Sequence, residues 1–177
     1  GLHNLENAVA AFAAVDQLGL TESEIREGLA TYKGVKRRFE VHINTEELVY
    51  IDDYAHHPSE LRAIIDSVKD LYPNKKITAV FQPHLYSRTQ DFMDEFALEL
   101  AQVDELLLLP IYPARELPIA GVTSDALLAK IDGKTAVCIP KEDVLEDLRQ
   151  REIEILLTLG AGDIDRLVPQ IKQQYGN

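Results

Sequence analysis

The sequence of 177 residues has a single cysteine, few basic residues and no long apolar run. The lone cysteine, Cys138, excludes an internal disulfide and a zinc site built on cysteines, and its apolar surroundings predict a buried small hydrophobe. No apolar stretch approaches the roughly 20 residues that a membrane-spanning helix needs, and no signal pattern opens the sequence. We therefore expect a cytoplasmic, reduced protein.

Basic residues number 18 against 30 acidic ones, and the formal net charge is -12. Because phosphate backbones and anionic membranes select for clustered lysine and arginine, we do not expect a general nucleic-acid or membrane binder. The run Lys36-Arg37-Arg38 is a local exception that suits one small anion. Hydrophobic residues make up 46% of the chain and charged residues 27%, which is typical of one globular α/β domain with an appendage.

The spacing of the apolar residues changes near residue 38. Before this point they are spaced for two helices, 4–18 and 21–32, and Thr21 and Glu24 are placed to form a capping box. After it, a hairpin of two short strands precedes a regular alternation of helices and strands. The predicted strands are 39–43, 48–51, 76–81, 105–109, 135–139 and 154–159, and the predicted helices are 58–71, 88–101, 124–131, 141–149 and 163–174.

Three of these strands are apolar without alternation, around 77–81, 106–109 and 155–159. Strands that are covered on both faces require this pattern. The predicted fold class is therefore α/β, with a mostly parallel, doubly wound sheet and an N-terminal hairpin strand. The two helices before it cannot bury a core alone. We expect residues 1–34 to be the end of a preceding domain and residues 35–177 to form the α/β domain, so the chain is expected to be a fragment of a longer protein.

The most informative motif is Asp52-Asp53-Tyr54-Ala55-His56-His57-Pro58, which lies between a predicted strand and a predicted helix. Ligands of open α/β sheets bind beyond the carboxyl ends of the strands, and the first turn of a helix offers unpaired N–H groups to an anion. A capped turn with Pro58 at the start of the helix is the simpler reading. Other strand ends favour a site, because they carry similar side chains.

Three further strands are followed by polar or glycine-rich segments, and parallel strands would bring all of these segments to one edge of the sheet. The segments are 82–89, 112–116 and 160–163. Within the first of them, Arg88 is placed to hold a phosphate or carboxylate in a bidentate manner. Gly160-Ala161-Gly162-Asp163 also has a simpler reading, as a tight turn and helix cap.

Two other patterns do not support a site. Gly133-Lys134-Thr135 resembles a phosphate loop only superficially, and we interpret it as a turn. His56, His57 and His84 lack the spacing of a helical metal pair and a clear further ligand, so no metal site is predicted. His3 and His42 are isolated and receive no catalytic role.

In this order, the motifs resemble the C-terminal part of the Mur ligases, and within that family the branch that adds L-alanine to UDP-N-acetylmuramate. The resemblance spans the whole chain and is most specific in DDYAHHP, FQPH-x-YSRT and RRFE. The matching segments are 1–8 (family pattern G-x-H-N-x-x-N), 34–40, 52–58, 81–89 and 160–163. The family often has arginine where this chain has Leu85, so one expected anion contact is missing or supplied elsewhere.

The resemblance implies an ATP-dependent, amide-forming ligase of peptidoglycan precursor synthesis, in which the muramoyl carboxylate becomes an acyl phosphate that the amine of L-alanine attacks. It also implies that residues 1–34 end a central ATPase domain and that residues 35–177 form a Rossmann-like third domain that closes over the site. The family's phosphate-binding loop and magnesium ligands are not found in this sequence. We therefore predict that ATP and Mg²⁺ act in the parent protein and that this fragment alone has no ligase activity.

The resemblance also implies residue roles. Asn4 and Asn7 would hydrogen-bond the adenine, Asp53 the ribose hydroxyls, and Arg38 would lie near the phosphates. The residues expected to face the muramoyl and alanine side are Tyr54, His56, His57, His84 and Arg88. A histidine of this set would accept a proton from the alanine ammonium or orient it, and the sequence does not decide which one does so.

Two alternatives stay open at this point. The first is the related ligase that reattaches recycled murein peptide to UDP-N-acetylmuramate, although FQPH-x-YSRT favours the alanine-adding enzyme. The second is a non-catalytic module that binds a nucleotide or a sugar. A glycine-rich lysine loop upstream in the parent reading frame would decide for an enzyme.

Overall fold

The computed structural model describes residues 2–131 and 135–176, with side chains from residue 5 onward. Two earlier interpretations therefore concern parts outside the described residues, namely the side chain of Asn4 and the turn at Gly133-Lys134. The helices are α1 (Leu2–Asp16), α2 (Glu22–Thr31), α3 (Pro58–Leu71), α4 (Tyr86–Asp91), α5 (Met93–Leu100), α6 (Ser124–Leu128), α7 (Val144–Arg149) and α8 (Val168–Tyr175). The strands are β1 (Glu40–Asn44), β2 (Val49–Asp53), β3 (Ile77–Phe81), β4 (Glu105–Leu108), β5 (Thr135–Cys138) and β6 (Ile155–Leu159), and two short 3₁₀ turns are η1 (Lys141–Asp143) and η2 (Asp163–Leu167).

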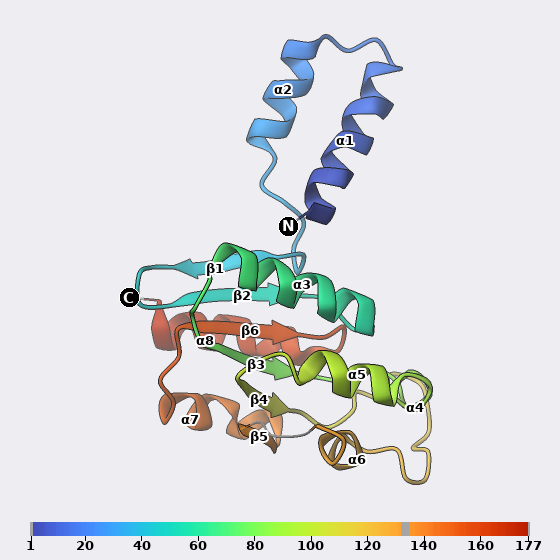
Figure 1. The fold of residues 1–177 in the computed structure, drawn as a ribbon, viewed down its shortest axis with the longest axis vertical. Helices are drawn as coiled ribbons and strands as arrows, with labels where there is room; N and C mark the ends of the chain where they lie inside the picture. The colour runs from blue at the N-terminus through green and yellow to red at the C-terminus, as the bar shows by residue number, and fades with distance from the viewer. Residues whose placement is uncertain (1, 132–134, 177) are drawn as a thin grey trace.

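The strands form one sheet in the order β1-β2-β6-β3-β4-β5. β1 is antiparallel to β2, while each of the other neighbouring pairs is parallel. This confirms the predicted α/β fold with a mostly parallel sheet and an N-terminal hairpin strand (Figure 1). The last strand in the chain, β6, lies between β2 and β3, so its loop is brought next to theirs.

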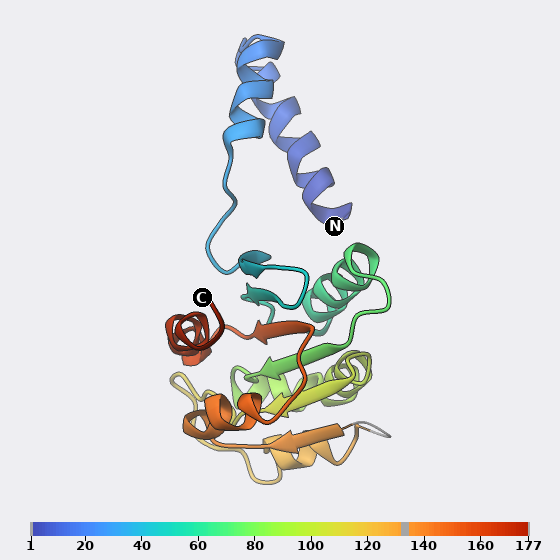
Figure 2. The ribbon, with the colours of Figure 1, turned by 90° about the vertical axis from the view of Figure 1, so that its left-hand side faces the viewer.

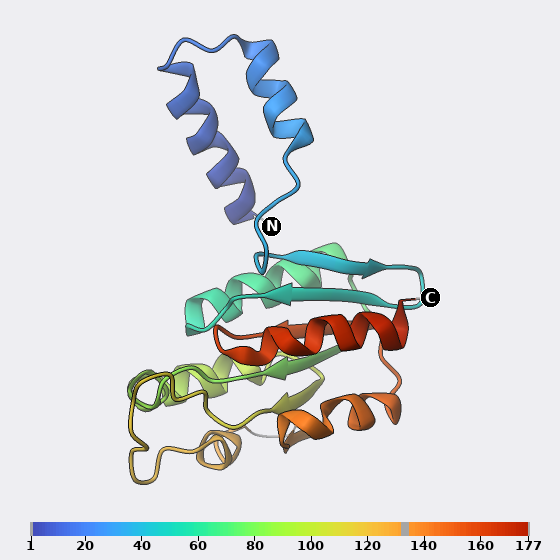
Figure 3. The same ribbon diagram turned by 180° about the vertical axis from the view of Figure 1, so that it is seen from behind.

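Helices cover both faces of the sheet. α3, α5 and α6 pack on one face, and α7, α8 and η2 pack on the other (Figures 2 and 3). Alternate strand residues therefore belong to different cores; in β6, Leu157 faces the first and Leu156 the second. α3 shows how the sequence produces this layer, because Leu61, Ile65 and Val68 recur at helical spacing and are fully buried.

The helical hairpin of α1 and α2 projects away from the sheet, as Figure 1 shows. Its second helix starts with the predicted capping box, in which the amide of Thr21 donates to Glu24 at 2.8 Å. Neither core cluster includes residues from this pair. Several of its apolar side chains are exposed instead: Leu5, Val9, Phe12, Leu18, Leu20 and Leu29.

Some predicted elements are broken in the structure. The single helix predicted over 88–101 is two helices, because Phe92 takes a non-helical conformation with φ −120° and ψ 25° between α4 and α5. The helices predicted over 141–149 and 163–174 each begin with a 3₁₀ turn. Within the described residues, no helix combines the length and the apolarity that crossing a membrane would take.

Candidate active site

The loops that follow β2, β6, β3 and β4 lie side by side at the carboxyl edge of the sheet. The amide of Gly160 donates to the carbonyl of Asp53 at 3.2 Å, and the amide of Gln82 donates to the carbonyl of Leu159 at 3.0 Å. An isolated parallel bridge joins His84 to Tyr112. The predicted convergence of these segments on one edge is therefore confirmed.

Asp53 lies at the end of β2 with 8% of its surface exposed. Its carboxylate accepts hydrogen bonds from the amides of Phe39 at 2.7 Å and of Ala55 at 2.8 Å. Burial raises its pKa, and the two amide donors oppose that rise. In this structure Asp53 anchors the entry to β1 and the turn after β2, and each oxygen keeps a second lone pair for another donor.

Tyr54 lies beneath two guanidinium groups. The guanidinium carbon of Arg37 is 4.9 Å from the centre of the ring, and that of Arg38 is 5.7 Å away. Arg38 also approaches Glu60 at 3.5 Å, and its side chain is 52% exposed. The exposed guanidinium of Arg38 is therefore held over the edge of the sheet and can reach a ligand there.

Arg37, which received no role of its own in the sequence analysis, connects three parts of this edge. Its guanidinium donates to the carbonyl of Gly160, to that of Gly162 at 3.4 Å and to the carboxylate of Asp52 at 3.3 Å. Its carbonyl accepts from the amide of Tyr54 at 2.7 Å. Arg37 therefore fixes the segment before β1 against the ends of β2 and β6, with its own backbone at φ 57°.

His56 and His84 are neighbours, with ring centres 6.0 Å apart. Nδ1 of His56 donates to the carbonyl of Tyr54 at 2.9 Å and lies 3.2 Å from a carboxylate oxygen of Glu60. A neutral His56 therefore carries its proton on Nδ1, which leaves Nε2 as an acceptor. Burial works against ionisation of Glu60, but the amide of His56 and the charges of His56 and Arg38 outweigh it and lower its pKa.

His84 has the opposite arrangement. Its Nδ1 accepts from the guanidinium of Arg88 at 3.4 Å, so a neutral ring carries its proton on Nε2. The ring stacks on Tyr112, with centres 5.7 Å apart and planes 13° from parallel. Burial, and then the positive charges of Arg88 and His56, lower the pKa of His84, while Glu116 opposes the change. The neutral form is thereby favoured near pH 7.

Arg88 lies on α4 close to His84. Within residues 2–131 and 135–176, no carboxylate is within 4.0 Å of its guanidinium. Its neighbour Ser87 is fixed by Glu116, which accepts from the Ser87 amide at 2.9 Å. Leu85, at the start of this helix, has a φ of 74°, and a branched residue adopts this conformation only under local constraint.

His57 is separated from the other two histidines in its contacts. It is the N-cap of α3, and its Nδ1 accepts from the amide of Ser59 at 3.4 Å. Its ring lies edge-on to Phe92, with centres 4.6 Å apart. The structure thus supports the capping reading for His57, while Tyr54, His56, His84 and Arg88 form the cluster at the sheet edge.

The two glycines of Gly160-Ala161-Gly162-Asp163 allow close packing against β3. A Cβ on Gly162 would lie 2.4 Å from the amide oxygen of Gln82 and 2.7 Å from the ring of Tyr112. Asp163 does not cap η2 as the simpler reading proposed, since no side-chain cap is present there. Its carboxylate instead accepts from Gln82 at 2.9 Å and from Lys141.

A sequence model described as "Mur ligase, glutamate ligase domain" matches residues 37–164. The chain belongs to the Mur ligase family. It is 51% identical over 180 residues to the UDP-N-acetylmuramate–L-alanine ligase of Cytophaga hutchinsonii, covering 99% of this chain and 39% of that protein. The chain therefore spans well under half the length of this curated relative.

Solved structures agree with this assignment. The UDP-N-acetylmuramate–alanine ligase of Thermotoga maritima has a TM-score of 0.82 and 28% identity, covering 99% of this chain and 38% of that one. A murein peptide ligase of Psychrobacter arcticus has a TM-score of 0.68 and 22% identity over 100% of this chain and 38% of that one. The second likeness shows the shared fold.

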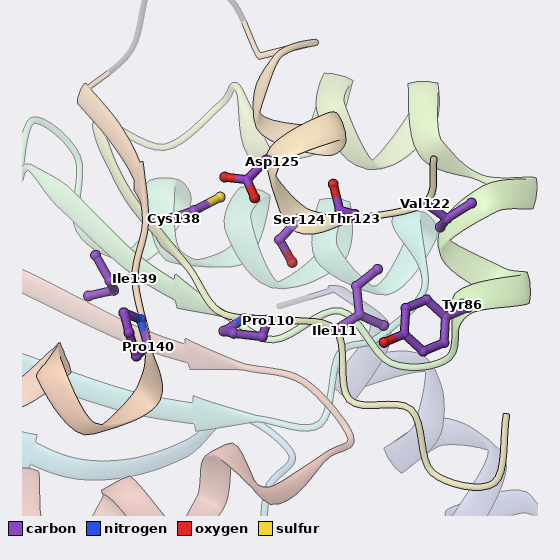
Figure 4. A pocket seen from close by; sticks show the side chains of 10 residues that line it. All are labelled: Tyr86, Pro110, Ile111, Val122, Thr123, Ser124, Asp125, Cys138, Ile139 and Pro140. Atoms are coloured by element: carbon purple, nitrogen blue, oxygen red, sulfur yellow. The ribbon is translucent and has the colours of Figure 1, made fainter. Parts of the chain in front are cut away.

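This Mur ligase chain also has an open cavity of about 360 Å³ beyond the ends of β4 and β5 (Figure 4). Tyr86 of α4 lies on its wall, so the cavity adjoins the helix that carries Arg88. Cys138 lines it and is half-buried, which corrects the buried position predicted from the sequence. Burial, and then the charge of Asp125, raise the pKa of this thiol to about 12, which favours the protonated thiol at neutral pH.

Several residues that hold this edge together lay in segments noted from the sequence but were given no individual role there: Arg37, Glu60, Gln82, Tyr112 and Glu116. Glu60 had a readable signal, because it follows His56 by four residues across the start of α3. Arg37 was part of the noted basic run, but nothing in that run distinguishes it from Arg38. The other three act across different loops, and their contacts depend on the order of the strands.

Proposed function

We propose that this chain is the C-terminal part of an ATP-dependent ligase that joins L-alanine to UDP-N-acetylmuramate. The observation that carries the proposal is the cluster of His56, His84 and Arg88 at the carboxyl edge of the sheet, in a chain half identical to ligases of that name. Arg38 is joined to this cluster through Glu60, which also contacts His56. Residues 1–34 would belong to the preceding ATPase domain, and residues 35–177 would be the domain that closes over the site.

The nucleotide side of the site would involve Asn4, Asn7, Arg38 and Asp53. ATP supplies the phosphoryl group that activates the muramoyl carboxylate. Asn7 is exposed on α1, and Arg38 is half exposed, so both are accessible to a ligand. Asp53 already accepts two amides, and a ribose hydroxyl would share its remaining lone pairs. The residues present are thus compatible with a bound nucleotide, and the Mg²⁺ ligands are proposed to lie elsewhere in the parent protein.

His56 is the better candidate to accept the proton of the alanine ammonium. Its Nδ1 proton is directed at the carbonyl of Tyr54, so its Nε2 lone pair is available. Glu60, 3.2 Å from Nδ1, stabilises the imidazolium that forms when a proton is taken up. His84 would serve as a donor from Nε2, because its Nδ1 is occupied by Arg88.

Arg88 would hold an anionic group of the substrates. Its guanidinium has no carboxylate partner among the described residues, and a partly buried charge is stabilised when a ligand supplies one. A carboxylate of L-alanine and a phosphate oxygen both suit its planar pair of donors.

The test uses the parent protein that carries this chain, with UDP-N-acetylmuramate, ATP and Mg²⁺. Phosphate release is measured with L-alanine and, separately, with a murein peptide that begins with L-alanine. Turnover with L-alanine and none with the peptide is expected. Turnover only with the peptide would favour the recycling ligase.

A second measurement separates an enzyme from a binding module. The 177-residue chain by itself is expected to release no phosphate with any acceptor and to bind ATP weakly. Failure of the parent protein to turn over any acceptor, together with tight binding of UDP-N-acetylmuramate or ATP by this chain alone, would favour the non-catalytic module.

A further inference from the structure

β1 contains a bulge at His42. Val41 is paired with Ile51 and Ile43 with Tyr50, so His42 is an extra residue on one side of the ladder. Because side chains alternate along a strand, one extra residue changes the direction in which the neighbouring side chains point. Such bulges are frequent next to functional sites. Here the bulge brings the His42 ring beside Tyr50, with centres 5.3 Å apart.

Three ligand atoms meet at this bulge. They belong to Glu40 and His42 of β1 and to Asp52 of β2, and all lie within 4.8 Å of one another. Glu40 and Asp52 are paired directly across the two strands, and Nε2 of His42 is 3.9 Å from a carboxylate oxygen of Glu40. One ion that bound all three would tie the edge strand to the rest of the sheet.

The imidazole of His42 is directed into this cluster without a partner. Its side chain is 9% exposed, and Nε2 has no hydrogen-bond partner in the structure of the described residues. A buried polar atom left unpaired costs free energy, so the position is favourable for a group that the imidazole can bind.

Asp52 has the outer support that metal ligands commonly have. One of its oxygens accepts from the hydroxyl of Thr158 at 2.6 Å, and that hydroxyl is 3.1 Å from the hydroxyl of Tyr50. The side chain of Asp52 is 1% exposed, whereas that of Glu40 is 33% exposed. The cluster is therefore held on its inner side and open to solvent on its outer side, where an ion could enter.

The nearest positive charge belongs to Arg37. Its Nε is 3.3 Å from the carboxylate of Asp52, which is a long contact. Its guanidinium makes a shorter hydrogen bond to the carbonyl of Gly160, and its backbone amide donates to Glu40 at 2.8 Å. Two carboxylates and one imidazole leave a negative charge. Arg37 offsets part of it across one long contact, and Lys172, whose charge also acts on His42, forms no ion pair with Glu40 or Asp52 among the described residues. Mixed nitrogen and oxygen ligands favour Zn²⁺, Co²⁺ or Mn²⁺ over Mg²⁺.

We propose that Glu40, His42 and Asp52 form a binding site for one divalent transition-metal ion that clips β1 to β2. This site contacts Arg37 of the carboxyl edge, but it uses none of the residues to which the proposed ligase function assigns a role. Its failure in experiment would therefore leave the proposed ligase function unaffected.

The experiment uses the 177-residue chain without a polyhistidine tag, after treatment with a chelator. It is titrated with ZnCl₂ by calorimetry and with CoCl₂ by visible absorption, in parallel with His42→Gln, Glu40→Gln and the control His84→Gln. We expect one equivalent of metal and a higher melting temperature on binding. His42→Gln and Glu40→Gln should each weaken binding by at least about tenfold, and His84→Gln should leave it unchanged.

Each outcome bears on the proposal. Absence of binding in millimolar Zn²⁺, or binding that His84→Gln removes and His42→Gln preserves, would overturn it. If His42→Gln lowers the melting temperature of the metal-free chain, the metal affinity of Glu40→Gln decides the question. The Glu40 side chain is partly exposed, and glutamine at this position keeps an oxygen that accepts from the Arg37 amide.

Discussion

At the scale of single residues, the three histidines of the motif segments differ in what their ring nitrogens contact. His56 donates from Nδ1 to a backbone carbonyl, His84 accepts at Nδ1 from Arg88, and His57 accepts at Nδ1 from the start of α3. In the neutral form, His56 therefore has Nε2 as an acceptor and His84 has Nε2 as a donor, while His57 caps a helix. These contacts depend on neighbours that a list of motifs does not contain.

Arg88 is the residue whose removal should affect ligation most selectively. Arg88→Ala in the parent protein should lower kcat/KM by about 10²-fold, because one charge-assisted donor to the developing charge is lost. The chain should stay folded, since the guanidinium makes no ion pair with the described residues. Arg149→Ala is a matched control: Arg149 is exposed on α7, and its ion pair among the described residues is with Glu146. Near-normal turnover of Arg88→Ala in a phosphate-release assay would remove Arg88 from the site.

His57 should prove replaceable by another capping residue. His57→Asn keeps a side-chain acceptor for the Ser59 amide, so ligation should persist, whereas His57→Ala should lower the free energy of unfolding by about 1 kcal/mol. Urea unfolding and steady-state kinetics check the two variants. A large loss of kcat in a stably folded His57→Asn would show that the imidazole takes part in the chemistry.

At the scale of elements, the site depends on loops that pack tightly against one another. The loop after β6 reaches Gln82 and Tyr112 so closely that only glycine fits at 160 and 162. Residues with positive φ gather in the same region, at Arg37, Phe39, Leu85 and Ala114. Constrained backbone of this kind is typical of functional edges, where surrounding contacts hold side chains in place.

Gly162→Ala should therefore be strongly destabilising, and Gly28→Ala should not. The new Cβ at 162 meets Gln82 and Tyr112, which should cost about 1–3 kcal/mol and displace the ring that stacks on His84. Gly28 lies inside α2 with nothing within 4 Å, so alanine there should stabilise the helix by up to about 1 kcal/mol. Denaturant unfolding of both variants measures the difference. Equal stabilities would show that the loop after β6 adapts easily.

At the scale of the whole molecule, two cores lie on opposite faces of one sheet, and the helical hairpin of α1 and α2 belongs to neither. The apolar side chains that this hairpin exposes are consistent with the proposed continuation into an ATPase domain. The α/β layers contain the buried residues that should determine the stability of the chain.

Deletion of residues 1–34 should leave the rest folded. The melting temperature of 35–177 should stay within about 3 °C of that of the full chain, since the buried clusters begin after this segment. Calorimetry measures this, and far-ultraviolet circular dichroism should show the loss of two helices only. A fall of more than about 10 °C would mean that the hairpin stabilises the α/β domain and that the proposed boundary is wrong.

The sequence by itself determined the class of fold and the edge at which the polar residues meet. Uninterrupted apolar strands such as Ile155–Leu159 need cover on both faces, and parallel strands must place their following loops on one side. These are local consequences of side-chain pattern. They were sufficient to predict the convergence of the DDYAHHP segment with the segments around His84 and Gly160.

Only the tertiary structure decided the order of the strands and the partners within the site. β6 lies between β2 and β3 although it is last in the chain, and this insertion sets the contacts of Arg37 with Gly160 and of Gln82 with Asp163. Likewise, the ring of His57, which caps α3, lies edge-on to Phe92 at the break between α4 and α5. Such contacts join residues that are far apart in the chain. Their stability depends on tertiary packing, which the pattern of neighbouring residues does not predict.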